Sequence, residues 1–204
     1  MIITEITEHD KKRCQVYIDG EKAFLLYKSE IRKYKLEKGT ELDQITYDVI
    51  VREVLTKRAI LRAMNLLQKR DYTEYKLRSK LKDGGYPSVS IDDAIDYVKS
   101  YKYLDDRRYA SDYIGYYMES RSKKRISQDL IQKGISKDLI AEVMEEAYSS
   151  KESDSNVELE QIQKLLLKKH FSSDMEYKEK QKIMAFLYRK GYSMDLIYKA
   201  MDMD

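Results

Sequence analysis

The sequence is poor in the residues that shape β-rich folds and in those that carry disulfide or metal chemistry. It has seven glycines, one proline, one cysteine, two histidines and no tryptophan among its 204 residues. So few glycines and prolines leave little material for the many turns of an all-β protein, which favours an α-rich fold. Cys14 cannot form an internal disulfide, and neither a long apolar run nor a signal-peptide core follows Met1. We therefore expect a protein of the reducing cytoplasm without a membrane span.

The sequence also lacks the motifs of common enzyme classes. It contains neither a Walker-type Gly-Lys-Ser/Thr loop nor a GxGxxG turn, and its two histidines and one cysteine give no zinc-binding spacing. A serine or cysteine triad has hardly any base available. Asp92-Asp93 and Asp105-Asp106 could hold Mg²⁺ for nuclease chemistry, but both pairs fall at predicted helix starts, where carboxylates favour the positive end of the helix dipole. We predict no catalytic activity, metal or cofactor, with a metal-dependent nuclease as a distant alternative.

The first part of the chain has the pattern of a β-hairpin. Residues 13–18 and 21–26 flank Asp19-Gly20, a dipeptide that supplies the positive φ angles of a two-residue turn. A two-stranded ribbon is marginal alone, so it needs a third strand from residues 2–6 or a covering helix. A helix is predicted over residues 29–36, with Gly39 as its stop.

From Asp43 onwards the apolar residues follow the helical period, and one pattern occurs three times. Leucine or isoleucine is followed four residues later by leucine and four residues after that by glycine, at residues 77–85, 126–134 and 183–191. Each glycine is expected to end a helix in the left-handed conformation, and Pro87, Ser136 and Ser193 are expected to begin the next one. A further amphipathic stretch precedes each copy, at residues 58–69, 105–119 and 157–170. The repeat unit is therefore three helices long.

These patterns predict a mainly α fold of tandem three-helix repeats with a small N-terminal β element. A three-helix unit of this length buries little apolar surface alone, so neighbouring units are expected to stack into an elongated, curved array. Residues 149–156 have no apolar side chain and are predicted to be a flexible linker. The predicted parts are a β-hairpin with a short helix at 1–42, a linking helix with the first repeat at 43–104, the second repeat at 105–150, and the linker with the third repeat at 151–204. Periodicity alone leaves open that the array is only a scaffold.

Positive charge is concentrated locally, although the net charge of +3 is nearly balanced. Residues 121–125 carry four positive charges in five residues, on a predicted loop that leads into the second helix of the middle repeat. Such a cluster repels itself unless an anion meets it, whereas any one lysine is better explained by an ordinary solvated helix surface. Acidic residues on the third helix of the middle repeat predict an opposite face of negative sign: Glu142, Glu145 and Glu146. Further basic residues lie in the first and third repeats: Lys76, Arg78, Lys80, Lys82, Lys164, Lys168, Lys169, Lys178, Lys180 and Lys182.

Tyrosine dominates the aromatic residues, with 19 Tyr against three Phe. Many tyrosines crowd the first two repeats, where they could stack on nucleobases beside the basic residues. Amphipathic packing is the more common role of tyrosine, because one end of the ring is apolar and the other is polar. Tyr109 and Tyr113, four residues apart, are therefore expected to line a core between helices.

Three motifs resemble the RecX family, the regulators of the bacterial recombinase RecA. They are Arg70-Asp71-Tyr72-Thr73-Glu74-Tyr75-x-Leu77-Arg78-x-Lys80-Leu81-x3-Gly85-Tyr86, Tyr103-Leu104-Asp105-Asp106-x-Arg108-Tyr109-Ala110 and Arg125-Ile126-x3-Leu130-x2-Lys133-Gly134-Ile135. The resemblance is strong over residues 59–146 and extends through the weaker third copy to the C-terminus. The family often has a glycine in the loop before the residue that matches Arg125, where this chain has Ser122-Lys123-Lys124.

The resemblance implies a protein that binds RecA filaments on single-stranded DNA, lies along their groove, and restrains ATP hydrolysis, strand exchange and filament growth. It implies no enzyme. We expect a monomer without a membrane or cofactor partner, and direct contact with single- or double-stranded DNA stays open. The alternative is a helical nucleic-acid-binding protein that acts independently of RecA. Charge density selects the candidate contact residues: Arg78, Arg107, Arg108, Arg121, Lys123, Lys124 and Arg125.

Overall fold

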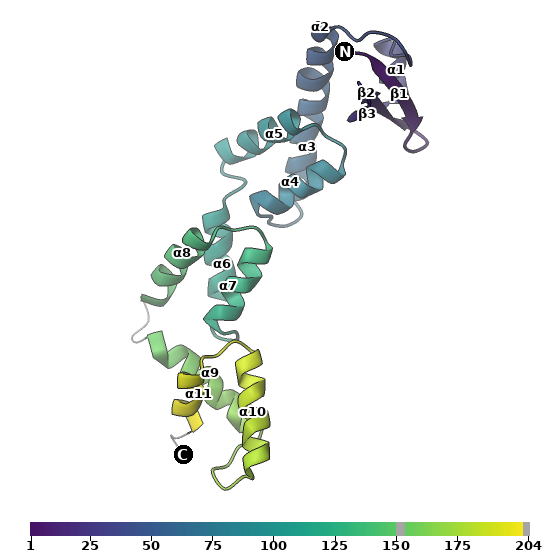
Figure 1. Cartoon of the computed structure of the whole chain (residues 1–204). Coiled ribbons are helices and arrows are strands. Elements are labelled where there is room, and N and C mark those ends of the chain that lie inside the picture. Colours follow the sequence, from purple (N-terminus) through teal and green to yellow (C-terminus); the bar gives the residue numbers. More distant parts are fainter. Residues whose placement is uncertain (150–153, 202–204) are drawn as a thin grey trace. The chain divides into compact units, whose positions relative to one another are not determined.

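The computed structural model describes residues 1–149 and 154–201, and most of them are helical (Figure 1). The chain forms two compact units, Met1–Asp105 and Asp106–Asp204. The first unit holds a three-stranded sheet and the first three-helix repeat, and the second holds the other two repeats. The predicted fold class, mainly α with tandem three-helix repeats and a small N-terminal sheet, is confirmed. Within the described residues, no helix has the length and apolar character needed to cross a bilayer.

The N-terminal sheet consists of β1 (Ile3–Glu8), β2 (Arg13–Ile18) and β3 (Glu21–Tyr27), antiparallel and in that order. The predicted turn joins β2 to β3, with a φ of 50° at Asp19 and 88° at Gly20, which are the positive values of a two-residue hairpin turn. The predicted third strand is β1, which pairs with β2. Alternation along β2 turns every second side chain, including the fully buried Val16, into the core.

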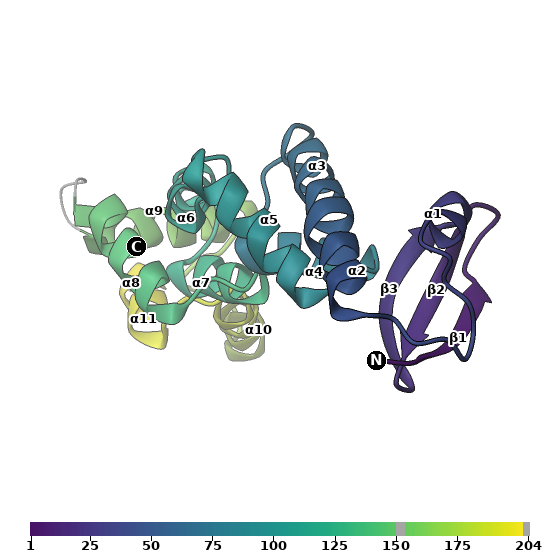
Figure 2. The same cartoon turned by 90° about the horizontal axis from the view of Figure 1, so that it is seen from above.

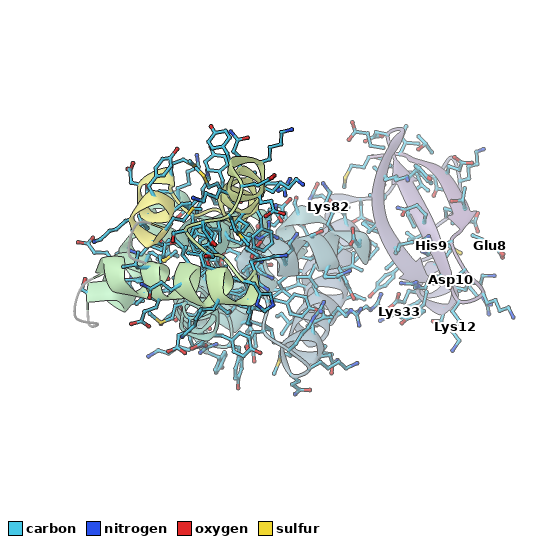
Figure 3. The ribbon with its side chains drawn as sticks, turned by 90° about the horizontal axis from the view of Figure 1, so that it is seen from below. Glu8, His9, Asp10, Lys12, Lys33 and Lys82 are labelled. Atoms are coloured by element: carbon cyan, nitrogen blue, oxygen red, sulfur yellow. The ribbon has the colours of Figure 1, made fainter. Side chains whose placement is uncertain are left out.

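Asp10 holds the end of the sheet where β1 turns into β2 (Figure 3). Its carboxylate accepts the backbone N–H of Lys12 at 2.9 Å and of Arg13 at 2.8 Å, and it pairs with the Arg13 guanidinium at 2.7 Å. These donors, the Lys12 N–H foremost, lower the pKa of Asp10 to about 2. Beside this turn Lys28 pairs with Glu8, which ties the first residue of α1 (Lys28–Lys33) to the end of β1.

The first apolar core lies among the sheet, α1 and the start of a long helical segment (Figure 2). Its buried side chains come from the sheet, from the segment after α1 and from the long helical segment: Phe24, Leu26, Leu36, Ile50, Val51 and Leu55. The helix predicted over residues 29–36 ends earlier, at Lys33, because Lys35 adopts a left-handed φ of 51°. Gly39, the predicted stop, instead lies in the following turn and donates its N–H to the carbonyl of Ile3 at 2.7 Å.

Residues 44–67 form one continuous helical segment, made of α2 (Gln44–Asp48), the π-helical stretch η1 (Val49–Leu55) and α3 (Thr56–Leu67). In η1 the carbonyl of Val51 accepts the N–H of Thr56, five residues on. The hydroxyls of Thr56 and Ser90 approach the same carbonyl at 3.1 Å and 3.2 Å. Ser90 belongs to α5 (Ser88–Ser100), so the π turn is accompanied by a contact between distant helices that the helical period did not reveal.

The first repeat consists of α3, α4 (Glu74–Asp83) and α5. Thr73 caps α4 by accepting the N–H of Lys76 at 3.3 Å. The predicted glycine stop is confirmed at Gly85, with a φ of 78°, and Pro87 precedes α5. Leu25 of β3 packs directly on Gly85, since a Cβ added there would lie 2.3 Å from Cδ1 of Leu25. The sheet therefore contacts the end of α4 through Leu25.

The second unit holds two further three-helix repeats. Their helices are α6 (Asp106–Tyr117), α7 (Lys123–Gln132), α8 (Lys137–Ser149), α9 (Asp154–Lys168), α10 (Tyr177–Arg189) and α11 (Met194–Met201). The predicted stops Gly134 and Gly191 have left-handed φ values of 89° and 97°. Ser136 and Ser193 cap the following helices, each accepting the backbone N–H three residues on at 3.3 Å. Each repeat has its own apolar core.

The linker predicted over residues 149–156 is too long at both ends. Ser149 is the last residue of α8 and Asp154 is the first of α9. Residues 150–153 of that prediction lie outside the described part of the chain. A polar composition alone does not distinguish the end turns of two helices from the segment between them.

Candidate functional site

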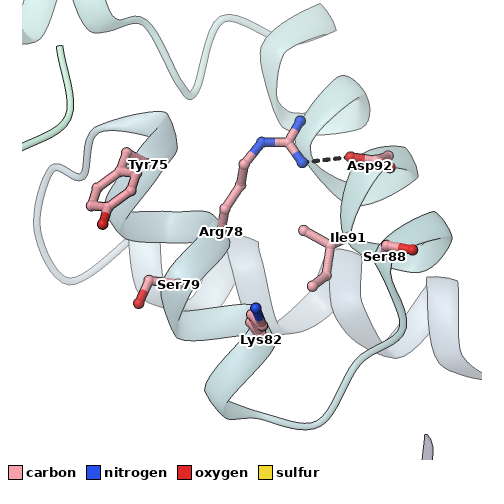
Figure 4. Close-up of a pocket in the computed structure, with 7 residues that line it drawn as sticks. All are labelled: Tyr75, Arg78, Ser79, Lys82, Ser88, Ile91 and Asp92. Atoms are coloured by element: carbon pink, nitrogen blue, oxygen red, sulfur yellow. Dashed lines mark hydrogen bonds and ion pairs between the residues drawn. The ribbon is translucent and has the colours of Figure 1, made fainter. Parts of the chain in front are cut away.

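The candidate residue Arg78 lies in a hollow between α4 and α5 (Figure 4). The hollow has a volume of about 450 Å³ and is lined by Tyr75, Arg78, Ser79, Lys82, Ser88, Ile91 and Asp92. Arg78 is held by two carboxylates, Glu74 at 2.7 Å and Asp92 at 2.5 Å. An anionic partner of Arg78 therefore has to compete with these internal partners.

Only one of the two aspartate pairs, Asp105-Asp106, lies at a helix start. Asp105 and Asp106 stand at the start of α6, as predicted. Asp92 and Asp93 do not stand at a helix start, because α5 already begins at Ser88. Asp92 pairs with Arg78, and Asp93 lies 3.4 Å from the hydroxyl of Thr56. In the part of the chain that the structure describes, no three His, Cys, Asp or Glu residues gather in a way that could hold a metal ion.

Arg107 contacts the acidic residues that were expected on the opposite face. Its guanidinium pairs with Glu142 at 3.0 Å and with Glu146 at 2.6 Å, which joins α6 to α8. The hydrogen bond that Arg107 donates to Glu142 is the main cause of the raised pKa of Arg107. The expectation of separate positive and negative faces in the middle repeat is therefore wrong at this position. Arg108, the next candidate, is exposed on the same helix.

The basic cluster at residues 121–125 is partly neutralised from within the fold. Arg121 donates to Asp129 at 2.7 Å and to the Tyr113 hydroxyl at 3.0 Å, and its guanidinium lies 3.6 Å from the ring centre of Tyr117. Arg125 pairs with the same carboxylate at 3.2 Å. Asp129 is a buried residue, so the anion that meets the cluster is internal. As predicted, Arg121 lies on the loop between α6 and α7, but its guanidinium is held by contacts within the fold.

Tyr109 and Tyr113 line the core of the second repeat, as predicted. Their rings are stacked with centres 6.4 Å apart, and both pack against the buried apolar residues of α6, α7 and α8. The Tyr113 hydroxyl also approaches Asp129 at 3.2 Å. Burial, followed by the charge of Asp129, raises the pKa of Tyr113.

The start of α7 is joined to the third repeat by polar contacts. Ser122 caps α7 by accepting the N–H of Arg125 at 3.2 Å, and its hydroxyl donates to the carbonyl of Lys190 at 2.7 Å. The backbone N–H of Lys123 donates to Glu158 of α9 at 2.9 Å. The Lys124 ammonium lies 5.7 Å from the ring centre of Tyr188. The cluster thus belongs to the junction of the second and third repeats.

Two further cations at this junction were not among the predicted contact residues. Arg189 and Lys190, at the end of α10, line a cavity of about 350 Å³ together with Ser120, Arg121, Ser122, Arg125 and Tyr192. A Cβ added at Gly191 would lie 2.5 Å from the Ser122 hydroxyl and 3.4 Å from Cβ of Lys124, so the turn after α10 touches the start of α7. The repeat spacing around Gly191 was visible in the sequence, but it did not indicate which repeat the turn would contact.

Tandem three-helix units, each with a helix that stops at a glycine, define a helical-repeat protein whose candidate site is a cation-lined surface. Family models of RecX match the same three units: the first three-helix domain at residues 59–97, the second at 105–144 and the third at 156–201. The regulatory protein RecX of Caldanaerobacter subterraneus subsp. tengcongensis is 31% identical over 205 residues, which covers 100% of both chains. The chain belongs to the RecX family.

Further relatives agree with this assignment. The regulatory protein RecX of Clostridium botulinum is 30% identical over 197 residues, covering 95% of this chain and 90% of the relative. A crystal structure of a regulatory protein RecX covers 100% of this chain and 99% of its own, with 26% identity and a TM-score of 0.66. The crystal structure of RecX from Lactobacillus salivarius covers 74% of this chain and 98% of its own, with 22% identity and a TM-score of 0.64, and shows the same fold.

Proposed function

We propose that this protein regulates the RecA recombinase by binding RecA filaments on single-stranded DNA. Bound there, it restrains ATP hydrolysis, strand exchange and filament growth. The observation that carries the proposal is the match to regulatory RecX proteins over the full length of the chain, with the three domain types in the same order. The protein acts in the cytoplasm as a monomer, by binding and without catalysis of its own.

The physical support for the proposal is the distribution of cations over the repeats. Arg78, Arg107 and Lys124 place at least one cation in the first repeat and two in the second. A RecA filament on DNA offers a repeating, partly anionic surface, and several weak contacts made by one chain raise the overall affinity through effective concentration. Complementary charge also accelerates the encounter and disfavours wrong partners.

The experiment is to add the purified protein to RecA filaments on single-stranded DNA and to follow ATP hydrolysis and filament disassembly. We expect ATP hydrolysis to fall and filament disassembly to increase as the protein is added. An absence of any effect on the filament, with the added protein folded, contradicts the proposal.

One charge reversal tests the contact surface in the same assay. Lys124→Glu is expected to weaken filament binding about tenfold, because it removes an exposed cation and adds repulsion. Lys124 is a cleaner choice than Arg121, since Arg121 is bonded to Asp129 within the fold. Lys182→Glu is the matched control, because Lys182 is also exposed but belongs to α10 and not to the cluster at residues 121–125. Equal binding by the two variants contradicts the placement of the surface.

The second candidate function is RecA-independent binding of nucleic acid, which the cation-lined cavity at the repeat junction favours. Binding driven by phosphate neutralisation falls steeply with the logarithm of salt concentration for naked polymer. Binding directed at RecA instead requires a preformed filament. Affinities for naked DNA and for filaments at the same salt concentrations therefore separate the two functions.

A further inference from the structure

The cavity between the start of α7 and the turn after α10 has an unusual wall. Among the described residues that line it, Arg121, Arg125, Arg189 and Lys190 are cationic and none is acidic. The remaining lining residues are two serines and the buried Tyr192. Basic residues of two repeats therefore line one space.

The charges in this wall are not balanced by the fold. Asp129 neutralises part of the charge through its bonds to Arg121 and Arg125, at 2.7 Å and 3.2 Å. Arg189 and Lys190 have no carboxylate partner within the described residues, and both are exposed. A second carboxylate, Glu158, is engaged by the backbone N–H of Lys123 at 2.9 Å. Basic residues therefore outnumber the carboxylates that neutralise them around the cavity.

We propose that this cavity binds a phosphate group of the single-stranded DNA backbone. The inference rests on the proposed function for the source of the phosphate, because the filament holds such a strand. Guanidinium groups on separate elements can approach a tetrahedral anion from different sides, each with a fork of two N–H donors. The N-terminal backbone of α7 is already engaged by Ser122 and Glu158, so the side chains make the contact.

The size of the cavity favours a phosphodiester over a protein carboxylate. A volume of about 350 Å³ corresponds to roughly a dozen water molecules at liquid density. This leaves room for a phosphate and part of its sugar, whereas one carboxylate fills only a small part of it. The phosphate carries a full negative charge on several acceptor oxygens, which suits several donors on one wall.

The test measures binding of a fluorescein-labelled thirty-nucleotide oligothymidine over a range of salt concentrations, without RecA. Arg189→Ala is expected to weaken binding about tenfold, as the loss of a charged hydrogen bond does. It is also expected to reduce the slope of log affinity against log salt by about 0.7, the value for one phosphate contact on a single strand. Lys190→Ala is a second, independent variant, and it should also weaken binding and reduce the salt slope. Lys182→Ala is the matched control and should leave affinity and slope unchanged.

The outcomes separate this inference from the proposed function. If Arg189→Ala and Lys190→Ala both leave oligonucleotide affinity and salt slope unchanged, the phosphate site is overturned. If they weaken binding to RecA filaments but not to the oligonucleotide, the cavity takes a carboxylate of the partner protein, and the inference is again overturned. A wild-type protein that restrains RecA but does not bind the oligonucleotide overturns the inference and supports the proposed function. A protein that binds the oligonucleotide through Arg189 without affecting RecA supports the phosphate site and contradicts the proposed function.

Discussion

Asp129 fixes the positions of several side chains at the start of α7. Its carboxylate is bonded to Arg121 and Arg125 and lies 3.2 Å from the Tyr113 hydroxyl. The residue is 8% exposed. When its charge is removed, Arg121 and Arg125 therefore lose a bond that water replaces poorly. Asp129→Asn is expected to lower the free energy of unfolding by about 1–3 kcal/mol. Urea denaturation measures the change, and Asp112→Asn, at an exposed position of α6, should have little effect. Equal losses in both variants would show that the buried network contributes nothing specific.

Tyr192 is expected to make the second unit less stable at alkaline pH. Burial, followed by the charge of Glu158, raises the pKa of Tyr192 to about 12, against about 10 in an unfolded chain. Its hydroxyl donates to Gln161 at 2.8 Å, an interaction that needs the protonated form. The folded state therefore holds this proton more tightly than the unfolded state, and the resulting stability is present below about pH 10 and lost between about pH 10 and 12.

The variant Tyr192→Phe tests this pH dependence. At pH 8 it is expected to unfold about 1–3 kcal/mol more easily, because Gln161 loses a buried donor. The difference in the free energy of unfolding between wild type and variant should narrow as the pH rises above 10, since the variant has no proton to lose at residue 192. The measurement is urea unfolding at pH 8, 10 and 11. If this difference stayed constant over the three pH values, stability would not depend on the ionisation of Tyr192.

At the scale of elements, the contact between β3 and the end of α4 depends on the absence of a side chain at Gly85. Gly85→Ala adds a Cβ at 2.3 Å from Cδ1 and 2.7 Å from Cγ of Leu25, at a φ of 78°. Gly39 has a similar φ of 83° but nothing within 4 Å of an added Cβ. Both alanine variants incur the left-handed backbone cost of about 1–2 kcal/mol, and only Gly85→Ala adds about 1–3 kcal/mol of overpacking.

Thermal or urea unfolding of the two glycine variants measures this difference directly. Gly85→Ala should be the less stable by at least about 1 kcal/mol. Adding Leu25→Ala to it should cost less than Leu25→Ala costs the wild type, because the clash disappears. If Gly85→Ala and Gly39→Ala were equally stable, the sheet would not rest on this glycine.

The helices were predictable because their signals are local. A glycine stop and a serine cap act within one turn of the chain, and Gly134, Gly191, Ser136 and Ser193 all have the predicted roles. The π turn was not predictable, since the contact between the Val51 carbonyl and Ser90 spans 39 residues of sequence. The same holds for the candidate site. The cluster at 121–125 was visible as a run of charges, but its neutralisation by Asp129 and its junction with Arg189 depend on packing between helices.

At the scale of the whole molecule, the first unit ends at Asp105, and its sheet shares a core with the long helical segment. Ile50, Val51 and Leu55 are buried in that core together with Phe24. We expect a fragment of residues 1–105 to unfold cooperatively on its own, because both of its cores lie within it. A fragment of residues 43–105 exposes the three apolar side chains of the long segment and should be markedly less stable.

Circular dichroism and urea unfolding of the two fragments check this expectation. The longer fragment should show both helix and strand and a sharp transition. The shorter one should unfold at lower urea or aggregate, since its apolar residues lose the sheet that covers them. Equal stability of the two fragments would mean that the sheet does not stabilise the long helical segment.

The hydrogen bonds between the second and third repeats have a consequence for how such a protein can evolve. Ser122 holds the turn after α10 through the carbonyl of Lys190, and Gln161 bridges Tyr192 to the carbonyl of Met118. At the repeat position that Ser122 occupies, the third copy has Glu179. Exchanging the order of the two copies would therefore place a bulky carboxylate where a small hydroxyl is needed. The second and third repeats share their pattern of apolar residues and glycine stops, yet at this position they are not interchangeable.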